Sequence, residues 1–307
     1  MPSLIENLSR DQVLFDAKNS AALYYDSPVR SADMHKDQGL FSSTVVVILE
    51  DESRVIVQLK DNEIDLTKVA LARSLLGSVV PRMNAAPTEY AFFAYVSNFL
   101  PGKMWIDVDS QFGIEQDSAI AKQIAGLIAR CNLGISSAGI VDSHIVPRLA
   151  HILKTRHNLP QDLRIRVENM LANVDSLKEL PLALCHIDIN KMNILVNPDT
   201  LEVTGLIDWE AAALLPLGMS AWCIRYLTVP IHRRQDEILE KSWPVTQAFW
   251  AAFFAAIPHN LQHLKSTFLL SAQIGFVLLN GIPESCHHSG ENLAALVPRL
   301  AWLDRAE

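Results

Sequence analysis

Apolar residues in the first hundred positions recur with the spacing of β-strands. Four segments have this pattern: residues 44–49, 54–60, 78–83 and 89–100. The first two are rich in β-branched side chains and are separated by a polar turn, which predicts an antiparallel hairpin. Residues 66–76 instead have helical spacing and end just before Gly77, a typical helix stop. The pattern predicts a lobe that is mostly sheet with one helix.

After Pro101 and Gly102 the periodicity becomes helical. Residues 120, 124, 127, 128 and 131 form one apolar stripe. A β-rich stretch interrupts the helices, with predicted strands at 194–196 and 203–207 around a polar turn. The sequence therefore predicts an α+β chain with two parts: a small β-rich N-terminal lobe, residues 1–100, and a larger, mainly helical C-terminal lobe, residues 101–307.

Composition narrows the class of partner. The 307 residues carry a net charge of −8, which disfavours nucleic acid and an anionic membrane surface as partners. The most apolar segment, residues 266–282, contains polar side chains and is shorter than the roughly 20 residues that a membrane span needs. The four cysteines are scattered without a C-x-x-C pair, and the N-terminus lacks the features of a signal peptide. We expect a cytoplasmic protein, of an oligomeric state that the sequence does not specify.

Polar residues stand at both ends of the predicted hairpin in the C-terminal lobe. His186 and Asp188 precede its first strand, Asn193 begins that strand, and Asp208 closes the second. Because the strands are antiparallel, the start of one lies beside the end of the other, so Asn193 and Asp208 are expected to be neighbours. A carboxylate and a carboxamide oxygen side by side form a site of the kind that Mg²⁺ accepts. Asp188 is then placed to face a hydroxyl group held near the metal.

These residues carry a resemblance to a known family. The pattern H-x-D-x-x-x-x-N at residues 186–193, followed by I-D-W-E at 207–210, resembles the aminoglycoside phosphotransferase family, a branch of the protein-kinase-like fold. The segment FLPGKMW, 99–105, is similar to the chain just after the interlobe hinge of that family, and PLGMSAW, 216–222, looks like its fungal members. The resemblance covers roughly residues 39–282 and implies a two-lobed protein-kinase-like fold.

The resemblance also implies roles for individual residues. Asp188 accepts or orients the proton of the acceptor hydroxyl, and His186 holds the loop. Asn193 and Asp208 bind Mg²⁺, which bridges the phosphates of ATP. ATP is expected between the lobes, with its adenine against the backbone of the hinge: Ser97, Asn98, Phe99 and Leu100. In such a reaction, catalysis is mostly positioning and charge neutralisation.

The phosphate-binding loop departs from the kinase pattern. In place of G-x-G-x-x-G the chain has a single glycine, Gly39, in GLFSST. The backbone amides and the hydroxyls of Ser42, Ser43 and Thr44 are candidates for phosphate contacts, whereas an ordinary turn before a strand is the alternative interpretation.

The position of the phosphate-binding lysine is open between two residues. Gln58 and Lys60 point to the same face of the strand 54–60, because side chains alternate along a strand. Lys60 carries the charge and is favoured, whereas an alignment with the kinase V-A-I-K motif selects Gln58. Glu63 and Asp65, candidates to pair with the lysine, both precede the apolar periodicity of the next helix.

The sequence thus predicts an ATP- and Mg²⁺-dependent phosphotransferase acting on a hydroxyl of a small molecule. An aminoglycoside, an amino alcohol, a sugar and a secondary metabolite all remain open as the acceptor. The degenerate phosphate loop leaves a rival prediction, a catalytically weak or inactive kinase-like protein that binds nucleotide or a partner, for instance within a biosynthetic pathway.

Overall fold

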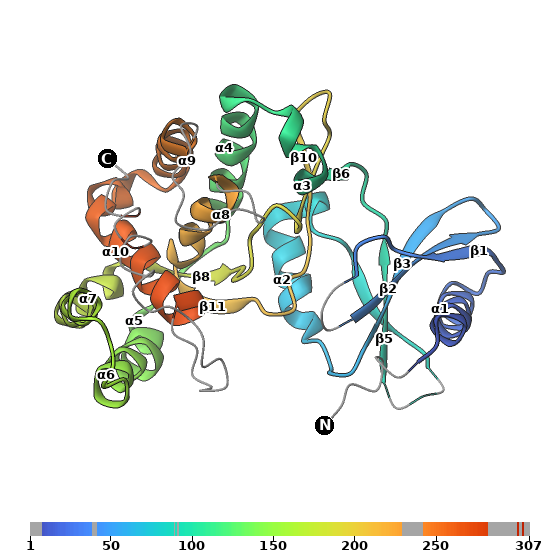
Figure 1. Ribbon diagram of the computed structural model, residues 1–307, viewed down its shortest axis with the longest axis horizontal. Helices are drawn as coiled ribbons and strands as arrows, with labels where there is room; N and C mark the ends of the chain where they lie inside the picture. The colour runs from blue at the N-terminus through green and yellow to red at the C-terminus, as the bar shows by residue number, and fades with distance from the viewer. Residues whose placement is uncertain are drawn as a thin grey trace. The chain divides into compact units, whose positions relative to one another are not determined.

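The computed structural model describes residues 8–38, 42–88, 90, 92–228 and 242–281, together with Leu300 and Leu303 (Figure 1). The chain forms two compact units, residues 1–101 and 102–307. We call them the N-terminal and the C-terminal unit.

The N-terminal unit is built on a five-stranded antiparallel sheet with the strand order β1-β2-β3-β5-β4. Its strands are β1 (Val29–Met34), β2 (Ser42–Leu49), β3 (Arg54–Lys60), β4 (Met83–Ala86) and β5 (Phe93–Asn98). Its helices are α1 (Arg10–Tyr25) and α2 (Leu66–Leu76), and a 3-10 turn, Gly77–Val79, follows α2. The predicted hairpin is β2–β3, paired in register from Ser42 opposite Lys60 to Ile48 opposite Arg54.

Alternation along β2 and β3 decides which face of this sheet is buried. Val45 and Val47 on β2 and Val57 on β3 are fully buried, in one apolar cluster with Ala17 and Ala21 of α1. Helix α1 lies against the sheet (Figure 1). The intervening residues of the two strands are only half-buried. The Lys60 side of the sheet is therefore the face that α1 does not cover.

Two expectations for this unit need correction. The strand predicted at 78–83 is wrong: Gly77–Val79 is a 3-10 turn, and β4 begins only at Met83. The lobe was also predicted to have one helix, whereas α1 is a second one, with 16 residues and a capping box formed by Ser9 and Gln12 at its start. Strand β1 had no clear signal in the sequence, because its side chains are half-buried or exposed along its whole length.

The C-terminal unit is mainly helical, with two small antiparallel sheets. Its helices are α3 (Trp105–Val108), α4 (Ile114–Arg130), α5 (Ala138–Ile140), α6 (Val146–Thr155), α7 (Gln161–Asn173), α8 (Ile224–Thr228), α9 (Ser242–Ala256) and α10 (Lys265–Phe276). Short 3-10 and π turns link several of them. One sheet has the order β10-β9-β6 and the other β11-β8-β7. The strands are β6 (Lys103–Met104), β7 (Asn132–Ser136), β8 (Pro181–Cys185), β9 (Ile194–Val196), β10 (Val203–Leu206) and β11 (Ala213–Pro216).

The core of this unit follows the predicted apolar stripe. Ile120, Ile124 and Ile128 of α4 are buried, and α4 packs along α9, whose Phe249 and Phe253 are also buried. The most apolar segment of the chain forms the helix α10 and the π turn, Val277–Gly281, that follows it. Within the described residues, every helix is too short or too polar to cross a lipid bilayer.

Candidate functional site

Two sheets hold the ends of the loop that carries the predicted site. Strand β8 enters the loop at Cys185, and β9 leaves it at Ile194; both residues are buried. Strand β8 pairs with β11 and β7, whereas β9 lies between β10 and β6. The loop 186–193 therefore spans two separately anchored strands, which restricts the positions of its side chains.

His186 is buried beneath this loop and stabilises it through hydrogen bonds. Its ring is 3% exposed, and its Nδ1 accepts a hydrogen bond from the Asp188 amide (3.2 Å). The proton must then be on Nε2, which donates to the Ile207 carbonyl (2.8 Å). Burial lowers the pKa of His186, against the opposing effects of the Ile207 carbonyl and the Asp188 carboxylate. Both ring nitrogens are used within the protein, so the geometry fits a positioning role.

Asp188 is exposed, and two carboxamides fix its orientation. Asn190 Nδ2 donates to Asp188 Oδ1 (2.9 Å), and Asn193 Nδ2 donates to Asp188 Oδ2 (3.1 Å). Asn193 Nδ2 also donates to the Asp188 carbonyl (2.8 Å). A carboxylate that is held in this way but still reaches solvent is available to a hydroxyl group of a ligand.

Asn193 and Asp208 are brought together as the hairpin geometry predicts. The Ile207 amide donates to the Asn193 carbonyl (2.9 Å), and Leu206 pairs with Ile194 across the strands. Asp208 follows directly, with a φ of 68° that residues other than glycine seldom adopt. Backbone conformations of this kind cost about 1–3 kcal/mol and are concentrated at functional sites.

The donor set at this point fits Mg²⁺. Both Asn193 Nδ2 hydrogens are directed at Asp188, which leaves its Oδ1 as the atom free for a cation, and the Asp208 carboxylate is exposed. Mg²⁺ usually takes one or two carboxylates and fills its shell with water and substrate phosphates. Within the described part of the chain, no group of three or more His, Cys, Asp or Glu side chains is placed to hold a metal ion. A metal here would depend on ligands from the substrate.

The predicted phosphate contacts lie at one end of the paired strands β2 and β3, which are interior strands of the N-terminal sheet. Lys60 ends β3 and is only 6% exposed, opposite Ser42 at the start of β2. Gln58, two residues earlier on the same face, is half-buried, so the geometry leaves both residues as candidates. Ser43 is the next residue of β2, whereas Gly39 lies outside the described residues.

The structure places Asp65 at the start of α2, where it also forms an ion pair with Lys68 (3.9 Å). Its carboxylate caps α2 by accepting hydrogen bonds from the Thr67 amide (3.1 Å) and hydroxyl (2.5 Å). The Thr67 hydroxyl is the main cause of the lowered pKa of Asp65. Glu63 is exposed and precedes the helix, and α2 itself contains no acidic residue. No carboxylate of α2 is therefore available to pair with Lys60.

The predicted hinge segment is partly committed to internal hydrogen bonds. Ser97 pairs within the sheet, and the Asn98 amide donates to the Arg82 carbonyl (3.3 Å). The Phe99 amide donates to the Arg54 carbonyl (3.3 Å). The Leu100 amide meets no acceptor among the residues that the structure describes. Leu100 is thus the position in this segment with a backbone donor to offer.

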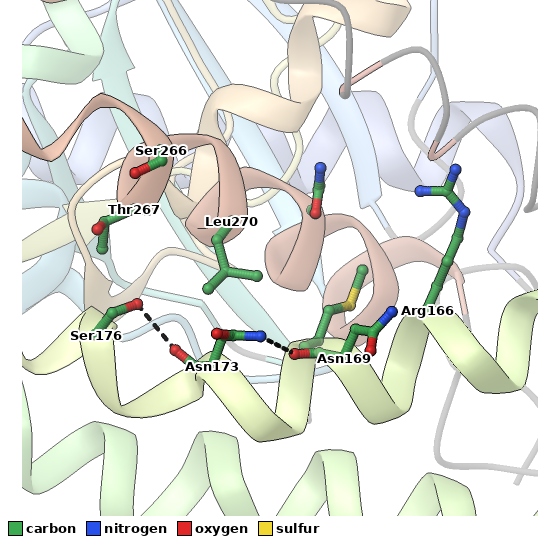
Figure 2. Close-up of a pocket in the computed structure, with 9 residues that line it drawn as sticks. Arg166, Asn169, Asn173, Ser176, Ser266, Thr267 and Leu270 are labelled. Carbon is green, nitrogen blue, oxygen red and sulfur yellow. Dashed lines mark hydrogen bonds between the residues drawn. The ribbon is translucent and has the colours of Figure 1, made fainter.

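A separate pocket of about 470 Å³ lies between α7 and α10 (Figure 2). Side-chain amides and hydroxyls dominate its lining, including Asn169, Asn173 and Thr267, and none of the lining residues is acidic. Asn173 Nδ2 donates to the Asn169 carbonyl (2.8 Å). Because none of its residues belongs to the loop 186–193 or to the β9–β10 hairpin, we assign this pocket no part in the site described above.

Sequence reasoning missed two residues of the loop. Asn190 and Lys191 occupy variable positions of the motif, so the resemblance assigned them no role. Asn190 orients Asp188, and Lys191 has a fully buried side chain. A short-range signal existed for Asn190, since an asparagine two residues from a carboxylate is within hydrogen-bonding reach. The burial of Lys191 depends on a distant partner and left no local signal.

Comparison with known proteins identifies the family. Residues 43–253 match the phosphotransferase enzyme family, and the chain therefore belongs to it. No protein with a curated description gives a significant match.

Solved structures confirm the protein-kinase-like fold. A macrolide 2'-phosphotransferase from Brachybacterium faecium is 17% identical with a TM-score of 0.56, covering 97% of this chain and 98% of that chain. A putative aminoglycoside phosphotransferase from Ralstonia eutropha is 15% identical with a TM-score of 0.56, over 94% and 97%. An ethanolamine kinase from Plasmodium vivax is 14% identical with a TM-score of 0.54, over 89% and 82%. At these identities the likeness establishes the fold, a β-rich part followed by a helical part.

Proposed function

We propose that the protein transfers the γ-phosphoryl group of ATP to a hydroxyl group of a small molecule, with Mg²⁺ as the metal. The observation that carries this proposal is the geometry of the loop 186–193 and the hairpin after it. There, one exposed carboxylate is oriented by two carboxamides, and a carboxamide oxygen and a second exposed carboxylate lie at the adjacent strand ends. Membership of the phosphotransferase enzyme family supports the same reaction class.

Asp188 is proposed as the residue that accepts the proton of the acceptor hydroxyl. The new bond forms between the hydroxyl oxygen and the γ-phosphorus, the bond to the bridging oxygen breaks, and ADP leaves. Asn190 and Asn193 keep the Asp188 carboxylate in one orientation. The carboxylate then does not have to lose rotational freedom in the transition state, which lowers the activation free energy of phosphoryl transfer. Asn193 Oδ1 and Asp208 would hold Mg²⁺, whose charge would neutralise the phosphates.

The N-terminal unit is proposed to contribute to nucleotide binding. Lys60 would supply positive charge to the phosphates, together with the hydroxyls of Ser42 and Ser43 at the facing strand end. The Leu100 amide would donate to the adenine ring, since the neighbouring Phe99 amide is used within the unit. The relatives named for macrolides and for ethanolamine indicate that this fold serves acceptors of very different size.

A second candidate function is nucleotide binding without efficient turnover. The observation in its favour is the segment 39–44, GLFSST, which has one glycine where protein kinases have G-x-G-x-x-G. Fewer glycines leave fewer positions at which the backbone can approach the phosphates closely. The base and both proposed metal ligands are nevertheless in place, which favours the catalytic proposal.

Nucleotide binding and turnover, measured separately, test the two candidates. A ligand at 100 times its Kd adds about 2.7 kcal/mol to the unfolding free energy, so Mg-ATP is expected to raise the melting temperature. ATP consumption is then followed over a panel of aminoglycosides, macrolides, amino alcohols and sugars. Asp188→Asn is expected to abolish turnover and keep the shift, whereas Asp208→Asn is expected to weaken both. Asp199→Asn, an exposed aspartate in the turn of the same hairpin, is the matched control and should change neither.

The outcomes decide between the two candidate functions. A shift without turnover on any acceptor favours the binding function. The absence of any shift with Mg-ATP refutes both candidates, and full activity of Asp188→Asn refutes the assignment of the base.

A further inference from the structure

Lys191 is a lysine in an unusual position. It lies in the loop 186–193, three residues after Asp188 and two before Asn193, yet its side chain is 0% exposed. The next residue, Met192, is 41% exposed. The loop thus turns a methionine outward and a charged side chain inward, the reverse of the usual preference. A buried ammonium group persists only where it is paired and hydrogen-bonded.

The partner of Lys191 comes from the start of the C-terminal unit. Lys191 Nζ donates to Asp109 Oδ2 (3.0 Å) and lies 4.9 Å from the centre of the Trp105 ring. Trp105 is itself fully buried, and its Nε1 donates to Asp117 Oδ1 (3.2 Å). The ammonium group therefore sits between a carboxylate and an aromatic face, an arrangement that stabilises a cation by charge and by the ring quadrupole.

The same two segments are also joined through the backbone. The Ile106 amide donates to the Lys191 carbonyl (3.1 Å), and Met104 of β6 pairs with Leu195 of β9. On the other side of Lys191, the Asn193 amide donates to the Asn190 carbonyl (3.0 Å). Side chain and main chain of Lys191 are thus both attached to residues 103–111, directly beside the proposed metal ligand.

We propose that the Lys191–Asp109 ion pair, seated on Trp105, is a clamp that fixes the loop between Asp188 and Asn193 and so sets the distance between the base and the metal ligand. Lys191 is then a positioning residue, since its buried head group is paired with Asp109. This inference rests on the proposed function for its catalytic consequence, but the clamp itself is a property of the loop.

Stability alone does not explain the pair. Replacing a buried ion pair by well-packed apolar residues is often neutral or stabilising, because two charges no longer have to be removed from water. Apolar side chains, however, pack in several ways, whereas the ammonium group has one carboxylate to meet. The clamp predicts that an apolar pair can restore the stability of the fold without restoring the order of the loop.

Four variants separate the clamp from a merely structural contact. Lys191→Met removes the charge and keeps the length, and Asp109→Asn removes the charge from the other side. The double variant Lys191→Met with Asp109→Leu contains no unpaired buried charge. Lys178→Met is the matched control, because Lys178 also pairs with aspartates, Asp142 and Asp175, but outside the loop 186–193.

Two readouts are taken on the 307-residue chain. Hydrogen exchange of peptides covering residues 184–196 is expected to be at least tenfold faster in Lys191→Met, in Asp109→Asn and in the double variant, and unchanged in Lys178→Met. The gain in ADP affinity on adding Mg²⁺ is expected to fall at least tenfold in the same three variants, with the affinity for metal-free ADP unchanged. The double variant should keep both defects while its melting temperature returns to that of the wild type.

The outcomes distinguish the clamp from the proposed function. Wild-type exchange at 184–196 in a folded Lys191→Met, or recovery of that protection in the double variant, overturns the clamp. If Lys191→Met does not fold, the double variant decides the same question. If the wild-type protein gains no ADP affinity from Mg²⁺, the proposed function fails, and hydrogen exchange still decides whether the pair orders the loop.

Discussion

The packing of α10 makes a quantitative prediction about one glycine. Gly275 lies against the turn 219–223, and a Cβ there would fall on the Met219 carbonyl oxygen, 3.0 Å from the carbonyl carbon and 3.1 Å from Trp222 Cδ1. The obstacle is backbone, so no side-chain rotation relieves it. Gly126, in the middle of α4, is the matched control, because a Cβ there meets no atom within 4 Å.

The two substitutions share one energy term and differ in the other. Alanine is favoured over glycine inside a helix by about 0.8–1 kcal/mol, and this gain applies to both positions. Overpacking a well-packed contact costs about 1–3 kcal/mol, and this cost applies to Gly275 alone. We expect Gly126→Ala to stabilise by somewhat under 1 kcal/mol. We expect Gly275→Ala to destabilise by up to about 2 kcal/mol, because the gain offsets part of the cost, so the two variants should differ by about 1–3 kcal/mol.

Urea unfolding followed by tryptophan emission measures this difference. All six tryptophans lie beyond residue 101, so the signal reports on the C-terminal unit alone. The two variants should have the same slope m and different midpoints. Equal midpoints for Gly275→Ala and Gly126→Ala would show that α10 does not approach the turn 219–223 as closely as described.

Three further predictions concern single buried groups. The pKa of His186 is lowered in the folded protein, so below about pH 6.5 the unfolded chain binds a proton at this residue before the folded protein does. The free energy of unfolding should therefore fall as the pH drops below that value, by at most about 1.4 kcal/mol per pH unit. His186→Gln should remove this part of the pH dependence of the urea midpoints, and an unchanged pH dependence would contradict a buried neutral ring. Ser137→Ala should lower the free energy of unfolding by about 1–3 kcal/mol in the same assay. The reason is that the buried Ser137 hydroxyl lies within hydrogen-bonding distance of the Leu177 and Leu180 carbonyls (2.9 and 2.8 Å). A decrease of less than about 0.5 kcal/mol would rule out a stabilising hydrogen bond there. Burial raises the pKa of the thiols of Cys131, Cys185 and Cys223, that of Cys185 to about 11. Peptide mass spectrometry should therefore find all three unlabelled by iodoacetamide in the native protein and labelled after unfolding. Labelling of any of them in the native protein would contradict its burial.

Local patterns in the sequence predicted the elements whose partners are close along the chain. The hairpin β2–β3 and the hairpin β9–β10 each join strands that are separated by a short turn, and the helix 66–76 was predicted with the observed bounds. The neighbourhood of Asn193 and Asp208 followed from the second hairpin alone. In these cases periodicity and turn residues specify the structure without knowledge of distant segments.

Elements that depend on distant partners were not predictable in this way. Strand β8, PLALC, is a short apolar run that periodicity cannot assign to strand or helix, and its partner β11 begins only at Ala213. The burial of Lys191 likewise depends on Asp109, 82 residues earlier in the chain. The role of Asp65 as a helix cap was missed because a cap and a cleft carboxylate have the same residue type at the same place before a helix.

The two-residue strand β6 has a consequence for the synthesis of the chain. Lys103 pairs with Val196, so more than ninety residues must be made before the partner of β6 exists. At about 5–20 residues per second, that interval is roughly 5–20 seconds on the ribosome. All five strands of the N-terminal sheet precede β6 and are available for pairing during this time, whereas the loop with Asp188 and Asn193 cannot close on residues 103–111 until later. Residues 103 and 104 are therefore on the nascent chain for seconds before the strand that pairs with them is made.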